Sequence, residues 1–499
     1  MTKTEIEKKY KLNDNLIRIK LLQYIPVLVV SQLCTMLILS VDGIIVSNYV
    51  GQEALAAVQI FHPVTAFLGV FTAIISNGTA HCLSARIVKN DFENLKYVKA
   101  AILKIIKYSV FIVAIIQIPI VFGILKSYHL EPEMYAMTRD YAIGIMFSLP
   151  FSIISAVSVC QLQTSGKMKV LMVLSLIEAG INLSLDLLFV KTLNMGVVGA
   201  GFGSAIASVS RALLTLAYVH FKTDTYKNID VKARMEDIKD IVKSGLPEAT
   251  SILVNSIQGY VMVRLLLHAF EGNTGATIKG VCTFCFGLAN VAITSVQGSM
   301  RPLINIMNGA DDKKGLYNSV RIAFRNLIIV VGVISIVMQI NPAMFYHLHG
   351  IKEIPKYGIE SLRFYVVFFI LSGINSIYRL YFVTKGDAKY TATLTFIVNN
   401  TLPIFAYILF RLFTPAHLWL SYTVTAFLVF IPNTIRYIKS VIKDNNTTDE
   451  GNTIYITVTP NDAANAAKDI EEFAKTEGLS DTTSSNLSTC LEKMVSSAI

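Results

Sequence analysis

The sequence predicts an all-α polytopic membrane protein, and three observations lead to this fold class. Hydrophobic residues make up 53% of the 499 residues and charged residues only 16%, whereas soluble domains carry about 25% charged residues. The hydrophobic residues occur in long runs, roughly as long as a helix must be to cross a bilayer. Charged residues gather between these runs. Because backbone polar groups in lipid must be satisfied within the segment, each run is expected to be a transmembrane helix.

Twelve runs are long enough to span a membrane. Their approximate bounds are 22–47, 61–86, 101–125, 137–161, 168–190, 199–221, 245–270, 278–302, 321–341, 358–382, 387–410 and 415–438. A long basic loop after the sixth run divides them into two sets, which predicts two pseudo-symmetric six-helix bundles. The expected parts are an N-terminal arm, an N-lobe, an inter-lobe loop, a C-lobe and a tail, over 1–21, 22–222, 223–244, 245–441 and 442–499.

Lysine and arginine are distributed unevenly among the loops. They are frequent in the N-terminal arm and in the loops after the second and sixth runs, whereas residues 48–59 contain none and the loop after the fifth run has only Lys191. By the positive-inside rule, both termini are expected in the cytoplasm of a multi-pass protein of the cell membrane. The net charge of +10 is accounted for by these loops, so no nucleic-acid partner is expected.

Acidic side chains inside the predicted spans are the most informative feature, because an ionisable group in lipid is costly. Glu178, Asn182 and Asp186 are spaced i, i+4, i+8, which places them on one helix face. Asp42, Asp186 and Ser204 lie four or five residues from the outer ends of their spans, about 6–8 Å below the membrane edge. Asp42, Asn182, Asp186 and Ser204 therefore predict a site for Na⁺ or protons. Acids that merely face water near the interface are the alternative.

The other intramembrane charges differ between the two halves. Glu178 lies nearer the midplane and is expected to face a cavity, whereas Glu248 opens a helix, where an acid complements the helix dipole. The charges of the second half are basic. Arg301 and Arg379 lie near inner span ends and can extend to the interface. Arg264 lies deeper and is a candidate for an internal cavity.

Segments of the first half resemble motifs of the multidrug and toxic compound extrusion (MATE) family. Residues 41–46, followed by 51–58, resemble the motif of its first helix. Residues 182–189 resemble the motif of the fifth helix. The glycine-rich segment 196–204 resembles the motif that follows, with Ser204 in place of a threonine.

The resemblance continues into the second half and covers about residues 20–440. Residues 245–247 resemble the opening of the family's second half, and 298–303 resemble the end of its eighth helix, where Arg301 replaces the usual glutamine. The resemblance implies a two-lobed, V-shaped exporter driven by entry of H⁺ or Na⁺. The family's N-lobe cation site corresponds to Asp42, Asn182, Asp186 and Ser204. The proline bend of its first helix corresponds to Pro26.

Some members of the family also carry acids in the seventh and tenth helices. At these places the chain has Asn255 and Gln258, and then Ser372, Asn375 and Ser376, so the resemblance does not extend to a C-lobe cation site. The residues expected to line the substrate cavity are Glu178, Asn255, Gln258 and Arg264.

The composition changes after Lys443. Residues 453–459 alternate like a strand, and 461–476 and 484–499 have helical patterns. Their order resembles the start of an anti-sigma-type histidine-kinase-like ATPase domain. Ser497 stands where that family has its Mg²⁺-binding asparagine, and so short a segment cannot bury a large core. The resemblance therefore implies a partial module that does not bind ATP.

These observations favour a secondary active exporter, not an enzyme. It is expected to act as a monomer without a cofactor and to exchange small organic compounds, cationic or amphipathic, for H⁺ or Na⁺. One alternative is a flippase for an anionic lipid-linked precursor, since arginines such as Arg264 can pair with phosphate. Another is a membrane-anchored regulatory protein that binds a protein partner through its tail.

Overall fold

The computed structural model describes residues 28–30, 32–33, 36–37, 40, 42–88, 92–164, 167–222, 231–309 and 313–447, and a few tail positions between 468 and 485. The predicted bend at Pro26, the N-terminal arm 1–21 and nearly all of the ATPase-like tail fall outside these residues. Residues 42–49 form a helical segment at the end of the first predicted span.

The described chain is almost entirely helical. The first half continues with α2 (Gln52–Val88), α3 (Phe92–Ser127), α4 (Pro132–Met146), α5 (Leu149–Thr164), α6 (Met168–Asp186), the π-helical turn η1 (Leu187–Thr192) and α7 (Gly196–Lys222). The second half contains α8 (Met235–Ala269), α9 (Thr274–Gly309), α10 (Lys313–Ile340), α11 (Pro342–Leu348), α12 (Gly358–Thr384), α13 (Ala388–Leu412), the 3₁₀ turn η2 (Pro415–Trp419) and α14 (Leu420–Thr447).

Ten helices of the described chain are long and apolar enough to cross a membrane, and α4 and α5, bent by 46°, add an eleventh as one broken span. The first predicted span lies largely outside the described residues. The prediction of an all-α polytopic fold is confirmed. Several helices extend beyond the apolar runs: α2, for example, begins at Gln52 rather than at residue 61.

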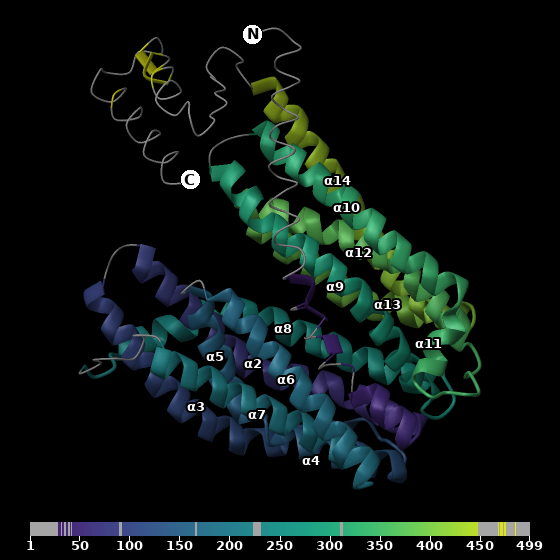
Figure 1. Cartoon of the computed structure of the whole chain (residues 1–499). Helices are drawn as coiled ribbons and strands as arrows, with labels where there is room; N and C mark the ends of the chain where they lie inside the picture. Colours follow the sequence, from purple (N-terminus) through teal and green to yellow (C-terminus); the bar gives the residue numbers. More distant parts are fainter. Residues whose placement is uncertain are drawn as a thin grey trace.

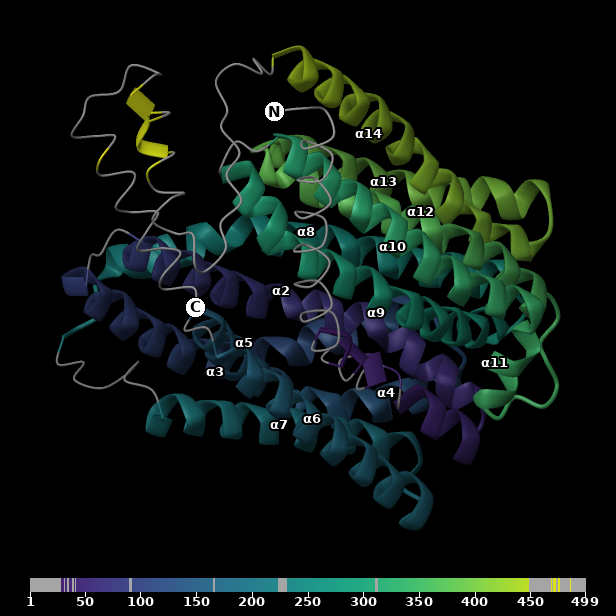
Figure 2. The same ribbon diagram turned by 45° about the horizontal axis from the view of Figure 1, so that its top comes forward.

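The helices form two lobes arranged like a V (Figure 1). Helices α2–α7, coloured purple to teal, make the N-lobe, and α9–α14, coloured green to yellow, make most of the C-lobe. The lobes lie close together at the end that carries α11 and spread apart toward the opposite end (Figures 1 and 2). The open end carries the termini of α7 and α8 that flank the basic loop, which is the end predicted to be cytoplasmic.

Helix α8 connects the lobes instead of belonging to one of them. Its first half packs tightly along α2, because Gly78 and Gly245 carry no side chain: a Cβ on either would lie 1.9 Å from a carbonyl oxygen of the other helix. Its second half contacts α13, where Asn399 donates to Asn255. The sequence assigned residues 245–270 to the C-lobe. In the structure residues 245–269 belong to α8, which packs against helices of both lobes.

The outer surface of both lobes is apolar. On α3, Phe111 and Ile115 are 67% and 68% exposed, and on α10, Ile336 and Ile340 are 60% and 75% exposed. Exposed apolar faces of this extent are the surfaces that lipid covers in a membrane protein. Polar side chains such as Asn182 and Asp186 are buried inside a lobe.

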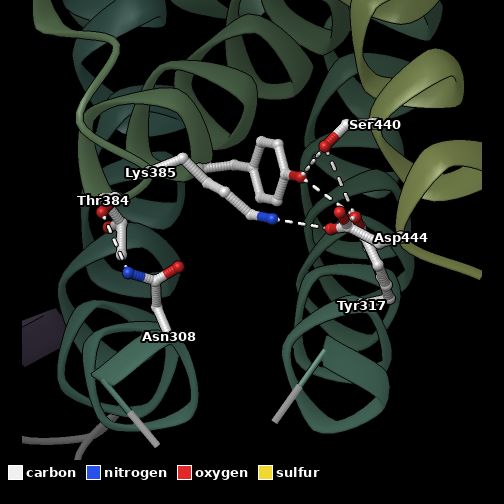
Figure 3. Close-up of polar contacts among 7 residues, drawn as sticks. Asn308, Tyr317, Thr384, Lys385, Ser440 and Asp444 are labelled. Atoms are coloured by element: carbon white, nitrogen blue, oxygen red, sulfur yellow. Dashed lines mark hydrogen bonds and ion pairs between the residues drawn. The ribbon is translucent and has the colours of Figure 1, made fainter. Parts of the chain in front are cut away.

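A polar cluster ties three C-lobe helices together at their inner ends (Figure 3). Asp444 on α14 accepts a hydrogen bond from Tyr317 of α10 and lies 2.7 Å from the Lys385 Nζ, just past α12. The hydroxyls of Ser440 and Tyr381 join the same network at 2.8 Å. Asn308 of α9 donates to the Thr384 carbonyl beside it. This cluster fixes the ends of α10, α12 and α14 relative to each other.

Candidate functional site

The candidate site of the N-lobe is built from four helical segments. Asp42 comes from the segment 42–49, Tyr141 from α4, Asn182 and Asp186 from α6, and Ser204 from α7. The four residues grouped by depth in the sequence, Asp42, Asn182, Asp186 and Ser204, thus lie together in the structure. Asp42 is 3% exposed, and Asn182 and Asp186 are fully buried.

Asp42 is the centre of a hydrogen-bond network. The Ser204 hydroxyl lies 2.8 Å from each of its carboxylate oxygens, and the Tyr141 hydroxyl donates to Oδ2 at 2.9 Å. The Asn182 amide donates to Ser204 Oγ at 2.9 Å and, at 3.4 Å, to Asp42 Oδ1. Three donors on one carboxylate hold it in a single orientation.

Asp186 lies beside Asp42, near enough for the two carboxyl groups to act on each other electrostatically. Two carboxylates this close repel each other unless a proton or a cation lies between them. The Oδ1 of Asp186 packs against Gly203 of α7, where an added Cβ would lie 2.1 Å from this oxygen. Directly after Asp186 the helix widens into the π-helical turn η1, a feature that is frequent at functional sites.

The site has an excess of buried acceptors. Both carboxylate oxygens of Asp186 and the amide oxygen of Asn182 have no hydrogen-bond donor in the described part of the chain. Neither Asp42 nor Asp186 forms an ion pair with a described lysine, arginine or histidine. Buried acceptors and buried negative charge without a partner are costly. A proton or an alkali cation bound between the carboxyl groups would remove both costs.

The ligand types suit a hard monovalent cation. The oxygens come from two carboxylates, an amide and two hydroxyls, and oxygen ligands are those that hard cations take. No group of three or more His, Cys, Asp or Glu side chains suited to a metal occurs among the described residues. Asp42, Asn182 and Asp186 are the residues of this cluster whose oxygens could hold Na⁺ or a proton.

The sequence alone did not predict two residues of this site. Tyr141 is one of 22 tyrosines, and nothing local distinguishes it. It reaches Asp42 because α4 and α7 approach closely at Gly144 and Gly201, where added Cβ atoms would clash with the facing backbone. Gly203 stands within the glycine-rich segment before Ser204, so its position carried a signal, but its contact with Asp186 is visible only in three dimensions.

The prediction that Glu178 faces a cavity is corrected by the structure. Glu178 is buried, and its Oε2 lies 2.6 Å from the Arg211 Nη1 of α7. The sequence did not predict this partner, because Arg211 lies in the next span, 33 residues from Glu178. Burial of a carboxylate is tolerated when a guanidinium pairs with it. Glu178 therefore links α6 to α7 and is absent from the lining of the C-lobe cavity.

Arg264 also lies away from the internal cavity expected for it. It is exposed at the outer end of α8, where it donates to the Ser127 carbonyl and lies 3.2 Å from the His129 Nδ1. It lines an outer pocket of about 320 Å³ beside the loop between α3 and α4. Arg264 therefore no longer supports the flippase hypothesis.

Of the other predicted cavity residues, Gln258 lines a cavity in the C-lobe, and Asn255 lies next to it through its bond with Asn399. A second intramembrane cation, Lys279 of α9, was overlooked in the sequence. Its Nζ donates to the Gln59 carbonyl of α2 at 3.2 Å, which joins the C-lobe to the N-lobe.

Comparisons with known proteins agree with this architecture. A family model described as MatE matches residues 28–188. Multidrug export protein MepA of Staphylococcus aureus (strain MSSA476) is 23% identical over 353 residues, 67% of this chain and 74% of the relative. MepA of Staphylococcus haemolyticus (strain JCSC1435) is also 23% identical over 353 residues, covering 70% of this chain and 77% of the relative.

Solved structures share the fold. The inward-facing conformation of a multidrug resistance MATE family transporter of the MOP superfamily superposes with a TM-score of 0.74 at 23% identity, covering 83% of this chain and 96% of the other. The outward-facing conformation of such a transporter gives 0.63 at 22% identity, over 85% and 96%. This two-lobed helical fold is the one that polytopic MATE family transporters share, and the match to the MatE family model lies in the first lobe.

Proposed function

We propose that this transporter is a secondary active exporter that moves small amphipathic organic compounds out of the cell in exchange for H⁺ or Na⁺. It is proposed to act as a monomer in the cell membrane, with both termini in the cytoplasm and without a cofactor. Relatives named multidrug export proteins support the transport direction. The observation that carries the proposal is the buried pair Asp42 and Asp186, which lacks a cationic partner among the described residues.

The helical segment that carries Asp42 also contacts the C-lobe, so cation binding at Asp42 can affect how the two lobes pack. Five residues further along the same helical segment, the Ser47 hydroxyl donates to the His349 carbonyl of the C-lobe at 2.6 Å. The Asn48 amide donates to the Leu348 carbonyl at 3.0 Å. A cation that neutralises Asp42 and Asp186 changes the packing of this segment, and the segment also holds the outer ends of the lobes together. Loading of the site is thereby coupled to the choice between inward- and outward-facing states.

The test removes the negative charges one at a time. In proteoliposomes with a Na⁺ gradient or a pH gradient imposed separately, Asp42→Asn and Asp186→Asn are expected to lower gradient-driven transport of an organic dye roughly tenfold or more. An amide cannot bind and release a proton and attracts a cation far less than a carboxylate does.

Asp140→Asn is the matched control, because Asp140 is next to Tyr141 but pairs with Arg139 on the surface. Its transport should equal that of the unsubstituted chain. Whichever of the two gradients drives transport identifies the coupling ion. Full gradient-driven transport by both Asp42→Asn and Asp186→Asn would exclude the proposed mechanism.

A further inference from the structure

The C-lobe encloses a cavity that is separate from the carboxylate pair. It has a volume of about 330 Å³ and lies among α8, α9, α12, α13 and α14. This volume is within the range of small-molecule sites in proteins. Asn290 and Arg379 on its wall are exposed, so solvent reaches the cavity while the lobes are spread apart.

The polar part of the lining consists of amides and hydroxyls held in place by their neighbours. Gln297 of α9 donates to the Ser376 carbonyl at 3.2 Å, and Asn375 of α12 donates to the Ala426 carbonyl at 3.0 Å. Asn433 of α14 donates to the Asn375 side chain at 3.4 Å. Amide groups fixed by such bonds keep their remaining donors and acceptors directed at a ligand, which lowers the entropic cost of binding.

Arg379 is the sole charged residue among those that line the cavity, all of which are described. It forms no hydrogen bond and no ion pair within 4 Å with a described residue, although Glu248 and Arg301 are near enough to act on it electrostatically. Of these three charges two are positive, so this part of the C-lobe has a net positive charge. A guanidinium without a fixed partner, inside a membrane protein, is an anion-binding group.

The cavity also has an apolar part. Phe368 and Tyr422 lie on its wall, with their ring centroids 5.5 Å apart, and Leu394, Val398 and Leu402 of α13 line the cavity as well. Aromatic and aliphatic side chains favour a ligand with a ring or another compact apolar body. The cavity thus combines an apolar wall with a single cation and neutral hydrogen-bonding groups.

We propose that this cavity binds the exported substrate through a carboxylate that pairs with Arg379, so that the substrates are aromatic acids or zwitterions. The proposal rests on the proposed export function and specifies its substrate class. One guanidinium matches a planar monoanion in a two-bond arrangement. The expectation of cationic substrates is replaced for this cavity, since a cation would meet Arg379 without an acidic residue in the lining.

The binding test uses the purified full chain in detergent without any ion gradient. The fluorescent probe is dansylglycine, which joins an aromatic body to a carboxylate, and the neutral comparison is dansylglycinamide. The unsubstituted chain is expected to bind dansylglycine about tenfold more tightly than the amide, a conservative value for a hydrogen bond to a charged group. Equal affinities for the two probes would overturn the proposal without any substitution.

Substitutions then locate the binding group. Arg379→Gln is expected to weaken dansylglycine binding about tenfold and to leave dansylglycinamide binding unchanged, whereas Arg379→Lys should keep part of the preference. Arg363→Gln is the control, because Arg363 is an exposed arginine at the other end of α12 and lies outside the cavity. Dansylglycine binding that is the same in Arg379→Gln and in the unsubstituted chain would overturn the assignment.

Competition separates a carboxylate from a phosphate as the recognised group. 1-Naphthoate is expected to displace dansylglycine at lower concentration than 1-naphthamide or 1-naphthyl phosphate. Stronger displacement by the phosphate would replace the proposed acid by a phosphate ester, such as a lipid headgroup. Because binding is measured without a gradient, its result is independent of the ion-driven transport that tests the proposed function. A chain that binds dansylglycine but shows no gradient-driven transport would contradict the export function alone.

Discussion

Gly203 shows how a single residue without a side chain can determine a site. The Asp186 carboxylate occupies the space that any larger residue at position 203 would fill. Asp186 is fully buried, so its carboxylate has little room to move away. The position of the second carboxylate therefore depends on a residue that provides no ligand.

Gly203→Ala is expected to reduce gradient-driven transport roughly tenfold, close to the effect of Asp186→Asn. The new Cβ would lie 2.1 Å from the Asp186 Oδ1, and a contact this short forces the carboxylate out of its position beside Asp42. The measurement is ion-driven dye transport in proteoliposomes, with protein amount and thermal stability determined in parallel.

Gly180→Ala is the matched control, since Gly180 lies on α6 between Glu178 and Asn182 with nothing within 4 Å of an added Cβ. Alanine there should leave transport intact and slightly favour the helix. Normal transport by Gly203→Ala would mean that the exact place of the Asp186 carboxylate has no importance for coupling.

At the scale of helices, the inner end of the C-lobe depends on the cluster around Asp444 (Figure 3). The Lys385 and Asp444 side chains are 24% and 14% exposed and 2.7 Å apart. Lys385 lies just beyond the predicted span. Burial lowers its pKa, but the hydrogen bonds and charge interactions with Asp444 and Tyr381 together outweigh this and raise the pKa overall. A partly buried ion pair with additional hydroxyl donors resists separation more than a surface pair does.

Asp444→Asn is expected to destabilise the chain by about 1.5–3 kcal/mol, the range for hydrogen bonds to charged groups. It removes the charge that holds Lys385 and weakens the bond from Tyr317, so the inner ends of α10, α12 and α14 come apart more easily. The measurement is the thermal unfolding midpoint in detergent, which should fall by several degrees.

The comparison for this substitution is Asp387→Asn, which removes an ion pair with Arg436 whose side chains are 41% and 44% exposed. Exposed pairs contribute about 0–1 kcal/mol, so its midpoint should change little. Equal shifts for Asp444→Asn and Asp387→Asn would show that the cluster does not stabilise the helix ends.

For the whole molecule, the contacts between the outer ends of the lobes determine which arrangement of the two lobes is favoured. Ser47 and Asn48 donate to backbone carbonyls of residues 348 and 349, and Lys279 donates to the carbonyl of Gln59. These bonds can form only while the lobes meet at this end, so they favour the arrangement of Figure 1, in which the lobes are spread apart at the end opposite α11.

The double substitution Ser47→Ala with Asn48→Ala removes two such bonds and is expected to shift the balance of the two states about thirtyfold toward the outward-facing one. Each hydrogen bond contributes roughly 1 kcal/mol net, and about 1.4 kcal/mol corresponds to a factor of ten. Distances between spin labels at the inner ends of α3 and α10 should shorten.

Thr65→Ala is the control because, among the described residues, the Thr65 hydroxyl bonds to the His62 carbonyl of its own helix and not to the other lobe. Unchanged inner distances in the double variant would refute the role of these outer bonds. The experiment is best done between pH 7 and 8. Burial lowers the pKa of His349, despite its bond to the Phe345 carbonyl, and a pH in this range keeps the imidazole from gaining a proton during the measurement.

The sequence by itself determined the class of fold and the main groups of the N-lobe site. Long apolar runs can only be buried in lipid or in a core, and their number predicted the helical bundle. Helical spacing and depth were enough to group Asp42, Asn182, Asp186 and Ser204, because span ends provide a common reference level.

Only the tertiary structure decided which charges are neutralised and which remain available. Glu178 and Arg211, 33 residues apart, form a pair, Arg264 lies at the outer surface, and Arg379 faces the C-lobe cavity. The orientation of a side chain around its helix, and the helix that it faces, depend on how the lobes pack. Depth along a span does not contain this information, because the energy of a buried charge is set by the partner that packing brings to it.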